Sequence, residues 1–177
     1  MLNMHRWDKK AEDFLFDQRI TEIIWSLLGE YLALQTMVYF KPGGSLGQAW
    51  HQDSYYFKLK SMAAWLALDD ATTDNGCLNI VPGQFDMLPV IEADPTESFT
   101  DIMADVDVSK AYPLELKRGD VAFFDGYVVH GSGKSNSSSS RGALISHYCS
   151  VDERSIAAGY NPLLTADKRE INLIELS

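Results

Sequence analysis

The sequence predicts a mainly β protein, a sandwich or barrel of antiparallel strands with a helix near its N-terminus. From Tyr31 onward the chain consists of short apolar stretches rich in β-branched and aromatic residues, a composition that favours strands. Turn-forming residues separate these stretches, and strands do not alternate with long helical segments as they would in a parallel sheet. Before Tyr31 the spacing of apolar residues is helical instead.

The helix is predicted over Lys9 to Glu30. Apolar residues recur there at spacings of three and four, which places them on one face of a helix. They are Phe14, Ile20, Ile23, Ile24, Leu27 and Leu28. Gly29 is expected to end the helix, because glycine is the residue most often found just past a helix C-terminus.

The strands are expected in LALQTMVYF, AAWLALDD, CLNIVPG, YPLELKRGD, VAFFDGYVVH and GALISHYCS. Turns are expected between them at KPGG, DNG, RGD and DG, because these residues tolerate or pre-set turn conformations. The acidic segment from Glu92 to Lys110 is expected to be a long insertion or lid. The polar chain after Val151 is expected to cover a sheet edge or to be partly disordered.

Length and composition predict a single domain over residues 1–177, with its core in residues 31–150. A chain of 177 residues that is 46% hydrophobic can bury one substantial core.

Because no apolar run could span a membrane and the N-terminus is too polar for a secretory signal, we expect a soluble, cytoplasmic protein. The net charge of −10 argues against a nucleic-acid partner and favours a small or hydrophobic organic substrate. Nothing in the sequence indicates the oligomeric state.

His51 and Asp53 are two residues apart in the stretch WHQDSYYF. On a strand, residues i and i+2 project from the same face, so this pair could offer a nitrogen and a carboxylate oxygen to one cation. The third ligand is expected to be His130, which ends YVVH at the mouth of the predicted barrel. His147 lies among apolar residues and is interpreted as a core residue, and His5 lies ahead of the core.

Two neutral imidazoles and a carboxylate form the facial triad of non-haem Fe(II) oxygenases, which leaves positions open for a bidentate 2-oxo acid and O₂. If the acid is 2-oxoglutarate, its far carboxylate needs a cation, and the guanidinium fork of Arg141 suits it. A hairpin across the serine-rich loop is expected to return Arg141 beside the strand of His130. A zinc hydrolase with the same ligands is chemically feasible, but no separate general base is present and Arg141 would have no task.

Three stretches in register resemble the phytanoyl-CoA dioxygenase family of Fe(II)- and 2-oxoglutarate-dependent oxygenases. They are WHQDSYYF, AAWLALDDATTDNGCLNIVPG and LKRGDVAFFDGYVVHGSGKSNSSSSRGALISHY. The resemblance implies a double-stranded β-helix, which is a jelly-roll or cupin-like barrel with the metal at its open end. It places iron ligation on His51, Asp53 and His130, and binding of the 2-oxoglutarate carboxylate on Arg141.

The same resemblance implies that Gln52, Trp65 and Met37 line the 2-oxoglutarate pocket. The chain departs from the family pattern where PGQF at residues 82–85 stands in place of Pro-Gly-Ser-His. It is also short ahead of the first matching stretch, where family members usually carry additional helices and strands.

The expected function is that of an Fe(II)- and 2-oxoglutarate-dependent dioxygenase. Such an enzyme would hydroxylate a small or lipid-like organic substrate with O₂, release succinate and CO₂, and use ascorbate as a reductant. The alternative is a non-catalytic jelly-roll module that keeps the metal and ligand sites but lacks a working pocket, because fold does not by itself determine function.

Overall fold

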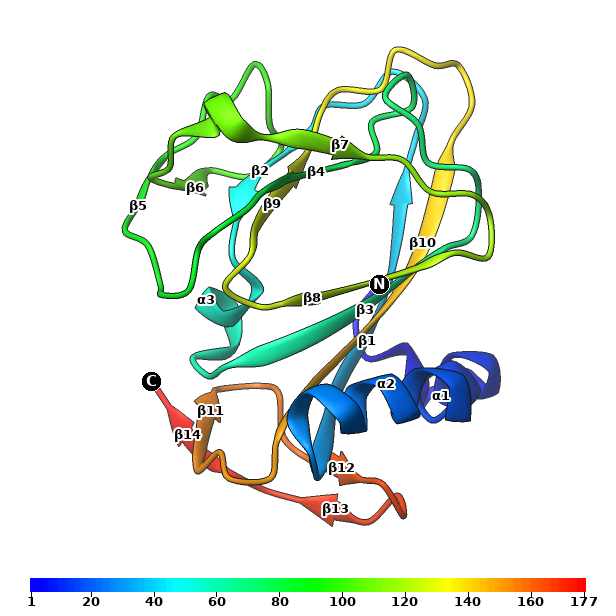
Figure 1. Cartoon of the computed structure of the whole chain (residues 1–177), viewed down its shortest axis with the longest axis vertical. Helices are drawn as coiled ribbons and strands as arrows, with labels where there is room; N and C mark the ends of the chain where they lie inside the picture. The colour runs from blue at the N-terminus through cyan, green and yellow to red at the C-terminus, as the bar shows by residue number, and fades with distance from the viewer.

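The computed structural model describes residues 1–177, and a six-stranded and a four-stranded sheet form its two walls (Figure 1). The larger sheet has the order β13-β12-β1-β10-β3-β8 and the smaller one β2-β9-β4-β7. The strands of the larger sheet are β1 (Tyr31–Lys41), β3 (Ser61–Ala67), β8 (Val121–Asp125), β10 (Arg141–Ser150), β12 (Leu163–Thr165) and β13 (Glu170–Ile171). Those of the smaller sheet are β2 (Gln48–His51), β4 (Leu78–Val81), β7 (Tyr112–Leu114) and β9 (Val129–Ser132). This arrangement confirms the predicted mainly β, jelly-roll class.

Strand β10 lies at the centre of the larger sheet, between β1 and β3. It pairs with β1 from Tyr31↔Ser150 to Lys41↔Arg141, with one irregularity between Ala33 and Gln35. Nine of its ten residues are buried, since both faces of this sheet are covered. On the inner face, Trp65 of β3 and residues of β10 pack against Leu78 of the smaller sheet to form the core between the two walls.

The N-terminal segment forms two helices instead of the single one predicted. They are α1 (Lys9–Leu15) and α2 (Gln18–Leu28), and a short 3₁₀ turn, η1 (Met4–Arg6), precedes them. The chain breaks at Asp17, whose side chain accepts a hydrogen bond from the backbone of Arg19 and so caps the second helix, in the manner of a typical N-cap. Gly29 ends α2 with a φ of 73°, as predicted.

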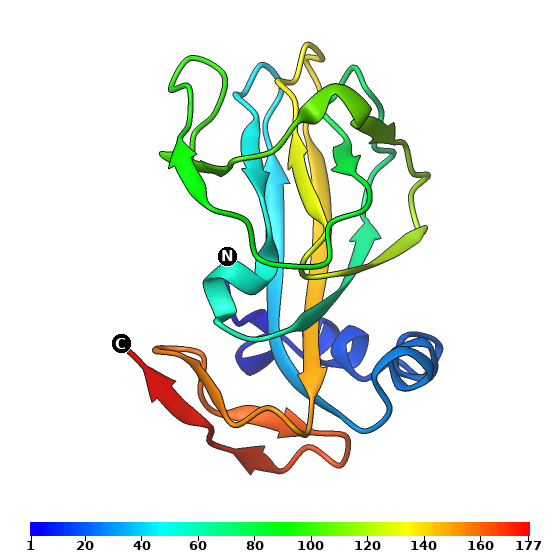
Figure 2. The same ribbon diagram turned by 60° about the vertical axis from the view of Figure 1, so that its left-hand side comes forward.

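Both helices cover the outer face of the larger sheet, away from the space between the walls (Figure 2). Leu15, Ile20 and Ile24 are buried against β-strand residues such as Ala64 and Tyr148. The Tyr148 hydroxyl also donates a hydrogen bond to the Leu15 carbonyl over 2.9 Å. No helix in the structure combines the length and the apolar character that a membrane crossing requires.

The acidic segment expected as an insertion or lid contains a small hairpin. Its strands are β5 (Val90–Glu92) and β6 (Ile102–Ala104), and the short turn η2 (Val108–Lys110) follows. The segment is tied to the edge strand β2: the Gly47 backbone donates to the Glu97 carbonyl over 2.9 Å, and the Ala49 backbone donates to the Ser98 hydroxyl over 2.8 Å. The hairpin is a separate two-stranded sheet, and the segment lies beside β2, the strand that carries His51 (Figure 1).

The C-terminal segment covers an edge of the larger sheet, one of the two outcomes expected for it. Strand β12 pairs with β1 at Leu32↔Thr165 and Ala33↔Leu164, and β13 continues the sheet. The remaining strands, β11 (Ser155–Ala157) and β14 (Ile174–Leu176), pair with each other in parallel.

Candidate metal centre and active site

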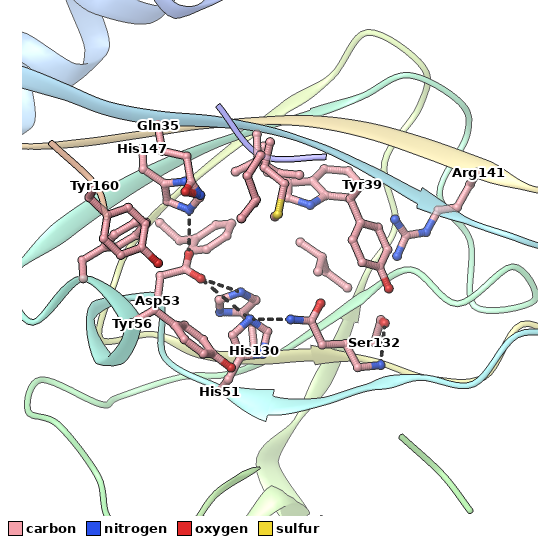
Figure 3. A pocket seen from close by; sticks show the side chains of 18 residues that line it. Gln35, Tyr39, His51, Asp53, Tyr56, His130, Ser132, Arg141, His147 and Tyr160 are labelled. Atoms are coloured by element: carbon pink, nitrogen blue, oxygen red, sulfur yellow. Dashed lines mark hydrogen bonds and ion pairs between the residues drawn. The ribbon is translucent and has the colours of Figure 1, made fainter. Parts of the chain in front are cut away.

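A cavity of about 230 Å³ lies between the two sheets. Figure 3 shows His51, Asp53 and His130 together in one part of it and Arg141 in another. Of the residues predicted from the sequence, all except Gln52 line this cavity, including Trp65 and Met37.

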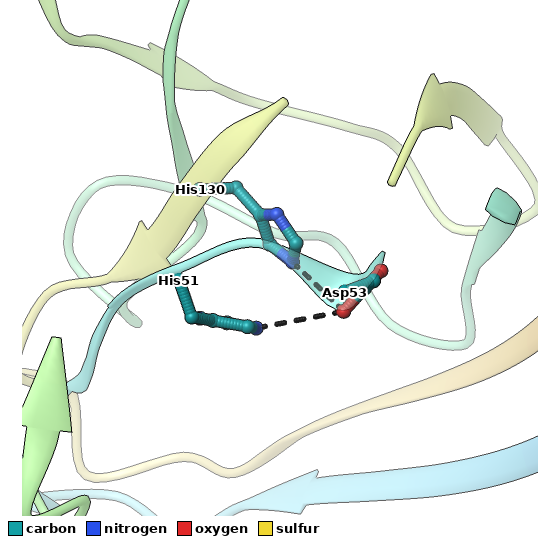
Figure 4. Close-up of side chains that lie close together, drawn as sticks. All are labelled: His51, Asp53 and His130. Atoms are coloured by element: carbon teal, nitrogen blue, oxygen red, sulfur yellow. Dashed lines mark ion pairs between the residues drawn. The ribbon is translucent and has the colours of Figure 1, made fainter. Parts of the chain in front are cut away.

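His51 and His130 are paired directly across the β2–β9 ladder, and their ring centroids are 4.1 Å apart. The Nδ1 atom of His51 lies 2.8 Å from the Ala49 carbonyl, and that of His130 lies 3.1 Å from the Val128 carbonyl. Because a carbonyl only accepts hydrogen bonds, each Nδ1 carries the proton and each Nε2 presents a lone pair. Both Nε2 atoms lie 3.7 Å from Oδ1 of Asp53 (Figure 4).

Asp53 reaches this position differently from the prediction. Strand β2 ends at His51, and Asp53 is the first residue of the short helix α3 (Asp53–Phe57). The expected alternation of a continuous strand is therefore wrong here. A single extended residue, Gln52, links strand and helix, and this turn brings ligand atoms of His51, Asp53 and His130 within 4.8 Å of one another.

The electrostatics of the cluster suit a divalent cation. Burial, followed by the neighbouring His130, lowers the pKa of His51 to about 4, so this imidazole is neutral at neutral pH. Burial alone would raise the pKa of Asp53, but the surrounding imidazoles, led by His130 and His147, outweigh it and hold this pKa below its usual range. His51 thus offers a neutral nitrogen and Asp53 an ionised carboxylate, which are the forms that bind a metal.

His147, interpreted from the sequence as a core residue, also belongs to this cluster. Its side chain is 3% exposed and its Nε2 lies 3.1 Å from Oδ2 of Asp53. Strand alternation could have indicated this position, because His147 and Arg141 are six residues apart on β10 and therefore share one face. The pattern was concealed because most residues between Arg141 and His147 are apolar, on both faces of the strand.

Arg141 is almost completely buried, with 1% of its surface exposed. Its Nε and Nη2 atoms donate to the Gly76 carbonyl over 3.1 and 2.7 Å, while Nη1 is buried without a hydrogen-bond partner. The guanidinium carbon lies 5.3 Å from the ring centroid of Trp65 and 5.6 Å from that of Tyr39, within the range of cation–π contacts. One free donor of a fixed cation therefore remains for a ligand in the cavity.

Two further residues at this end were not identified from the sequence. Tyr39 lines the cavity, and Lys41, two residues later on β1, is 1% exposed and pairs with Arg141 in the ladder. The Lys41 ammonium donates to the Leu46 carbonyl over 2.7 Å. Burial, followed by the charge of Arg141, lowers its pKa to about 8. Two buried cations give this end of the cavity a positive potential.

The predicted hairpin between His130 and Arg141 is wrong. Strand β9, which carries His130, belongs to the smaller sheet, whereas β10, which begins at Arg141, belongs to the larger one. The serine-rich loop therefore crosses from one wall to the other. Both side chains reach the same cavity because each points inward from its own wall (Figure 3).

Gln52, predicted to line the co-substrate pocket, directs its side chain away from this cavity. Its amide nitrogen donates to the carbonyls of Asp86 and Tyr127 over 2.9 and 2.7 Å, and its amide oxygen accepts from the Leu88 backbone over 2.8 Å. All of these partners lie outside the cavity. As an extended residue between two inward-facing neighbours, His51 and Asp53, Gln52 has to project to the opposite side.

Tyrosines line the part of the cavity next to Asp53. Tyr56 of α3 and Tyr160 of the C-terminal segment both line it, and Figure 3 shows them beside Asp53. Burial, followed by the charge of Asp53, raises the pKa of both hydroxyls, so they stay protonated. Of the aromatics WHQDSYYF supplies, Tyr56 and Phe57 face the cavity. Nothing in the sequence near Tyr160 indicated its position.

Comparison with known proteins places these features in context. The sequence model of the family described as "Phytanoyl-CoA dioxygenase (PhyH)" matches residues 3–143. A phytanoyl-CoA dioxygenase domain-containing protein 1 homolog from Dictyostelium discoideum is 33% identical over 178 residues, covering 92% of this chain and 63% of the relative. The chain thus spans somewhat less than two thirds of that relative's length.

Solved structures share the fold at lower sequence identity. A non-heme monooxygenase, ThoJ in its apo form, is 22% identical with a TM-score of 0.81, covering 99% of this chain and 68% of that protein. The epimerase SnoN, solved with Fe³⁺, alpha-ketoglutarate and nogalamycin RO, is 18% identical with a TM-score of 0.70, covering 85% of this chain and 62% of that protein.

Proposed function

The chain belongs to the phytanoyl-CoA dioxygenase family, and on this basis we propose that it is an Fe(II)- and 2-oxoglutarate-dependent oxygenase that hydroxylates a small or lipid-like organic substrate. The observation that carries the proposal is the pairing of two sites in one cavity. At one, the Nε2 atoms of His51 and His130 converge on Asp53, and at the other Arg141 holds a free Nη1 donor.

The donor set fits iron. Two imidazole nitrogens and one carboxylate oxygen are the ligands of the facial triad, and His51 and His130 each have Nδ1 fixed by a backbone carbonyl. Such contacts orient metal-binding imidazoles. The Nε2 atom of His51 also faces a donor, the Gln48 amide at 3.2 Å, as expected for a lone pair. Fe(II) held by these residues would be chelated by the 2-oxo acid and would supply the activation of O₂.

Arg141 would bind the distal carboxylate of 2-oxoglutarate. The guanidinium is fixed by Gly76 and by the rings of Trp65 and Tyr39. Little side-chain conformational entropy is therefore lost when its remaining donor binds a ligand. An anion at this position would relieve the cost of a buried cation whose Nη1 has no partner. Lys41 adds to the favourable potential.

In the overall reaction, one atom of O₂ enters a substrate C–H bond as hydroxyl and the other enters succinate, while carbon 1 of 2-oxoglutarate leaves as CO₂. The substrate would approach from the side of Tyr56 and Tyr160. This part of the cavity presents aromatic rings and neutral hydroxyls, which favours an uncharged, largely apolar group at the reacting carbon.

The test measures co-substrate chemistry before a substrate is known. The purified chain is given Fe(II), ascorbate and 2-oxoglutarate, and succinate release is measured with and without candidate acyl and lipid-like substrates. We expect slow release without substrate and stimulation by a true substrate. Anaerobic titration of 2-oxoglutarate should also produce the visible absorption of a 2-oxo acid chelated to Fe(II). Absence of both succinate and binding would overturn the proposal, while binding without turnover would support a non-catalytic module.

A further inference from the structure

We propose that His147 is a positioning residue that holds Oδ2 of Asp53, so that Oδ1 faces the metal, and that Gln35 supports the required tautomer of His147. This inference rests on the proposed function, because it concerns the iron ligand Asp53. His147 lies on β10, 94 residues along the chain from Asp53, and the fold brings the two side chains together.

The two oxygens of the Asp53 carboxylate have separate partners. Oδ1 lies 3.7 Å from Nε2 of both His51 and His130, whereas Oδ2 lies 3.1 Å from Nε2 of His147. A carboxylate whose second oxygen is hydrogen-bonded cannot rotate freely, and such outer contacts fix the orientation of a metal ligand. Because His147 occupies Oδ2 of Asp53, Oδ1 is the oxygen that remains to bind the cation.

The imidazole of His147 is itself held rigidly. It lies on the central strand β10, is 3% exposed, and its ring centroid is 4.9 Å from that of Phe57. Phe57 is the last residue of α3, the helix that Asp53 begins. The same short helix thus supplies both the carboxylate that His147 binds and the ring that fixes the plane of its imidazole.

Unpartnered polar atoms next to His147 point to Gln35 as the supporting residue. The Nδ1 atom of His147 and the Oε1 atom of Gln35 are both buried without a hydrogen-bond partner. The two residues are paired across the β1–β10 ladder, and Figure 3 shows their side chains beside each other. When Nε2 donates to Asp53, a neutral imidazole has its lone pair on Nδ1. A rotation of the Gln35 amide would direct its amino group to that lone pair and satisfy it.

The experiment compares two amide replacements at position 147. The amide nitrogen of glutamine reaches approximately the place of Nε2, whereas that of asparagine reaches approximately the place of Nδ1. His147→Gln should therefore keep the donor to Asp53, and His147→Asn should lose it with polarity preserved. His5→Gln, at a buried histidine outside the cavity, is the control. Anaerobic Fe(II) binding is measured for each, together with thermal unfolding.

We expect His147→Asn to weaken Fe(II) binding by about 10- to 100-fold, and His147→Gln and His5→Gln to stay within a few-fold of the unchanged protein. A smaller loss is expected for Gln35→Leu. Equal Fe(II) affinity in the asparagine and glutamine variants would overturn the inference. If asparagine at position 147 prevents folding, the Gln35→Leu variant decides, and unchanged affinity there overturns the part assigned to Gln35. Failure of the unchanged protein to bind Fe(II) would instead contradict the proposed function.

Discussion

Arg141 donates two hydrogen bonds to the carbonyl of Gly76, through Nε at 3.1 Å and Nη2 at 2.7 Å. Gly76 lies in the turn before β4 with a φ of 72°, a conformation that glycine adopts without steric cost. The turn thus fixes the direction of the guanidinium. A loop of the smaller sheet therefore orients Arg141, which belongs to the larger sheet.

The first prediction concerns this turn. In Gly76→Ala, the added Cβ would lie 2.4 Å from the Lys41 side chain and 2.7 Å from the Gly133 carbonyl, at a backbone angle that is strained for alanine. We expect a loss of about 1–3 kcal/mol in the free energy of unfolding and a higher KM for 2-oxoglutarate. Gly83→Ala is the matched control, because Gly83 also has positive φ but has open space around it. A destabilised Gly76→Ala variant with unchanged KM would show that the turn does not orient Arg141.

The second prediction concerns the guanidinium itself. Arg141→Lys keeps the charge but loses the fork that both holds Gly76 and presents Nη1. Because hydrogen bonds to charged groups contribute about 1.5–3 kcal/mol, we expect the KM for 2-oxoglutarate to rise by roughly 10- to 100-fold with a smaller change in kcat. Steady-state succinate release measures both constants. An unchanged KM would mean that the carboxylate binds elsewhere in the cavity.

The chemistry of this site was more predictable from the sequence than its geometry. Histidine, aspartate and arginine are scarce in apolar strands, so His130 and Arg141 stood out beside the pair His51 and Asp53. Apolar stretches rich in β-branched and aromatic residues, bounded by turn residues, likewise identified the long strands β1, β3 and β10. These features depend on residue type and local composition, which can be read directly from a sequence.

What remained hidden depends on contacts between distant segments. Asp17 interrupts an otherwise continuous helical pattern because its side chain caps a new helix. His147 has apolar neighbours, and only the fold brings it to Asp53 from 94 residues away. Gln52 sits between two site residues, but its direction was decided by a turn that the strand interpretation did not include.

The third prediction tests the carboxylate. Asp53→Ala removes the oxygen on which both imidazoles converge, and we expect succinate release to fall below detection and Fe(II) binding to be strongly weakened. A chelator should abolish the activity of the unchanged protein, and added Fe(II) should restore it. Because Asp125, an acid in a surface ion pair with Lys60, is not in the cavity, Asp125→Ala serves as the control. Full activity in Asp53→Ala would exclude this residue as an iron ligand.

The fourth prediction separates a structural role from a binding role at Gln52. Replacement by leucine leaves the carbonyls of Asp86 and Tyr127 and the Leu88 amide without their side-chain partner. Since an unsatisfied buried group costs about 1–3 kcal/mol, we expect Gln52→Leu to lower the free energy of unfolding by at least that amount. The KM for 2-oxoglutarate should stay close to its original value in the folded fraction. A large rise in KM without loss of stability would restore the role that the sequence suggested.

The fifth prediction concerns the pH dependence of stability. Burial, with a smaller effect of Arg6, lowers the pKa of His5 from 6.5 to about 4, and its Nδ1 lies 3.0 Å from the Thr36 hydroxyl. As the pH falls below 6.5, His5 becomes protonated in the unfolded chain but stays neutral in the folded chain. The free energy of unfolding therefore decreases between pH 6.5 and 4, and the contribution of His5 is fully present above this window. The contribution is on the order of 1–3 kcal/mol. In denaturant unfolding across this range, His5→Gln should lose less stability than the unchanged protein, because glutamine does not titrate. The effects of the carboxylates are common to both proteins and cancel in the comparison. Parallel curves would show that His5 is protonated equally in both states.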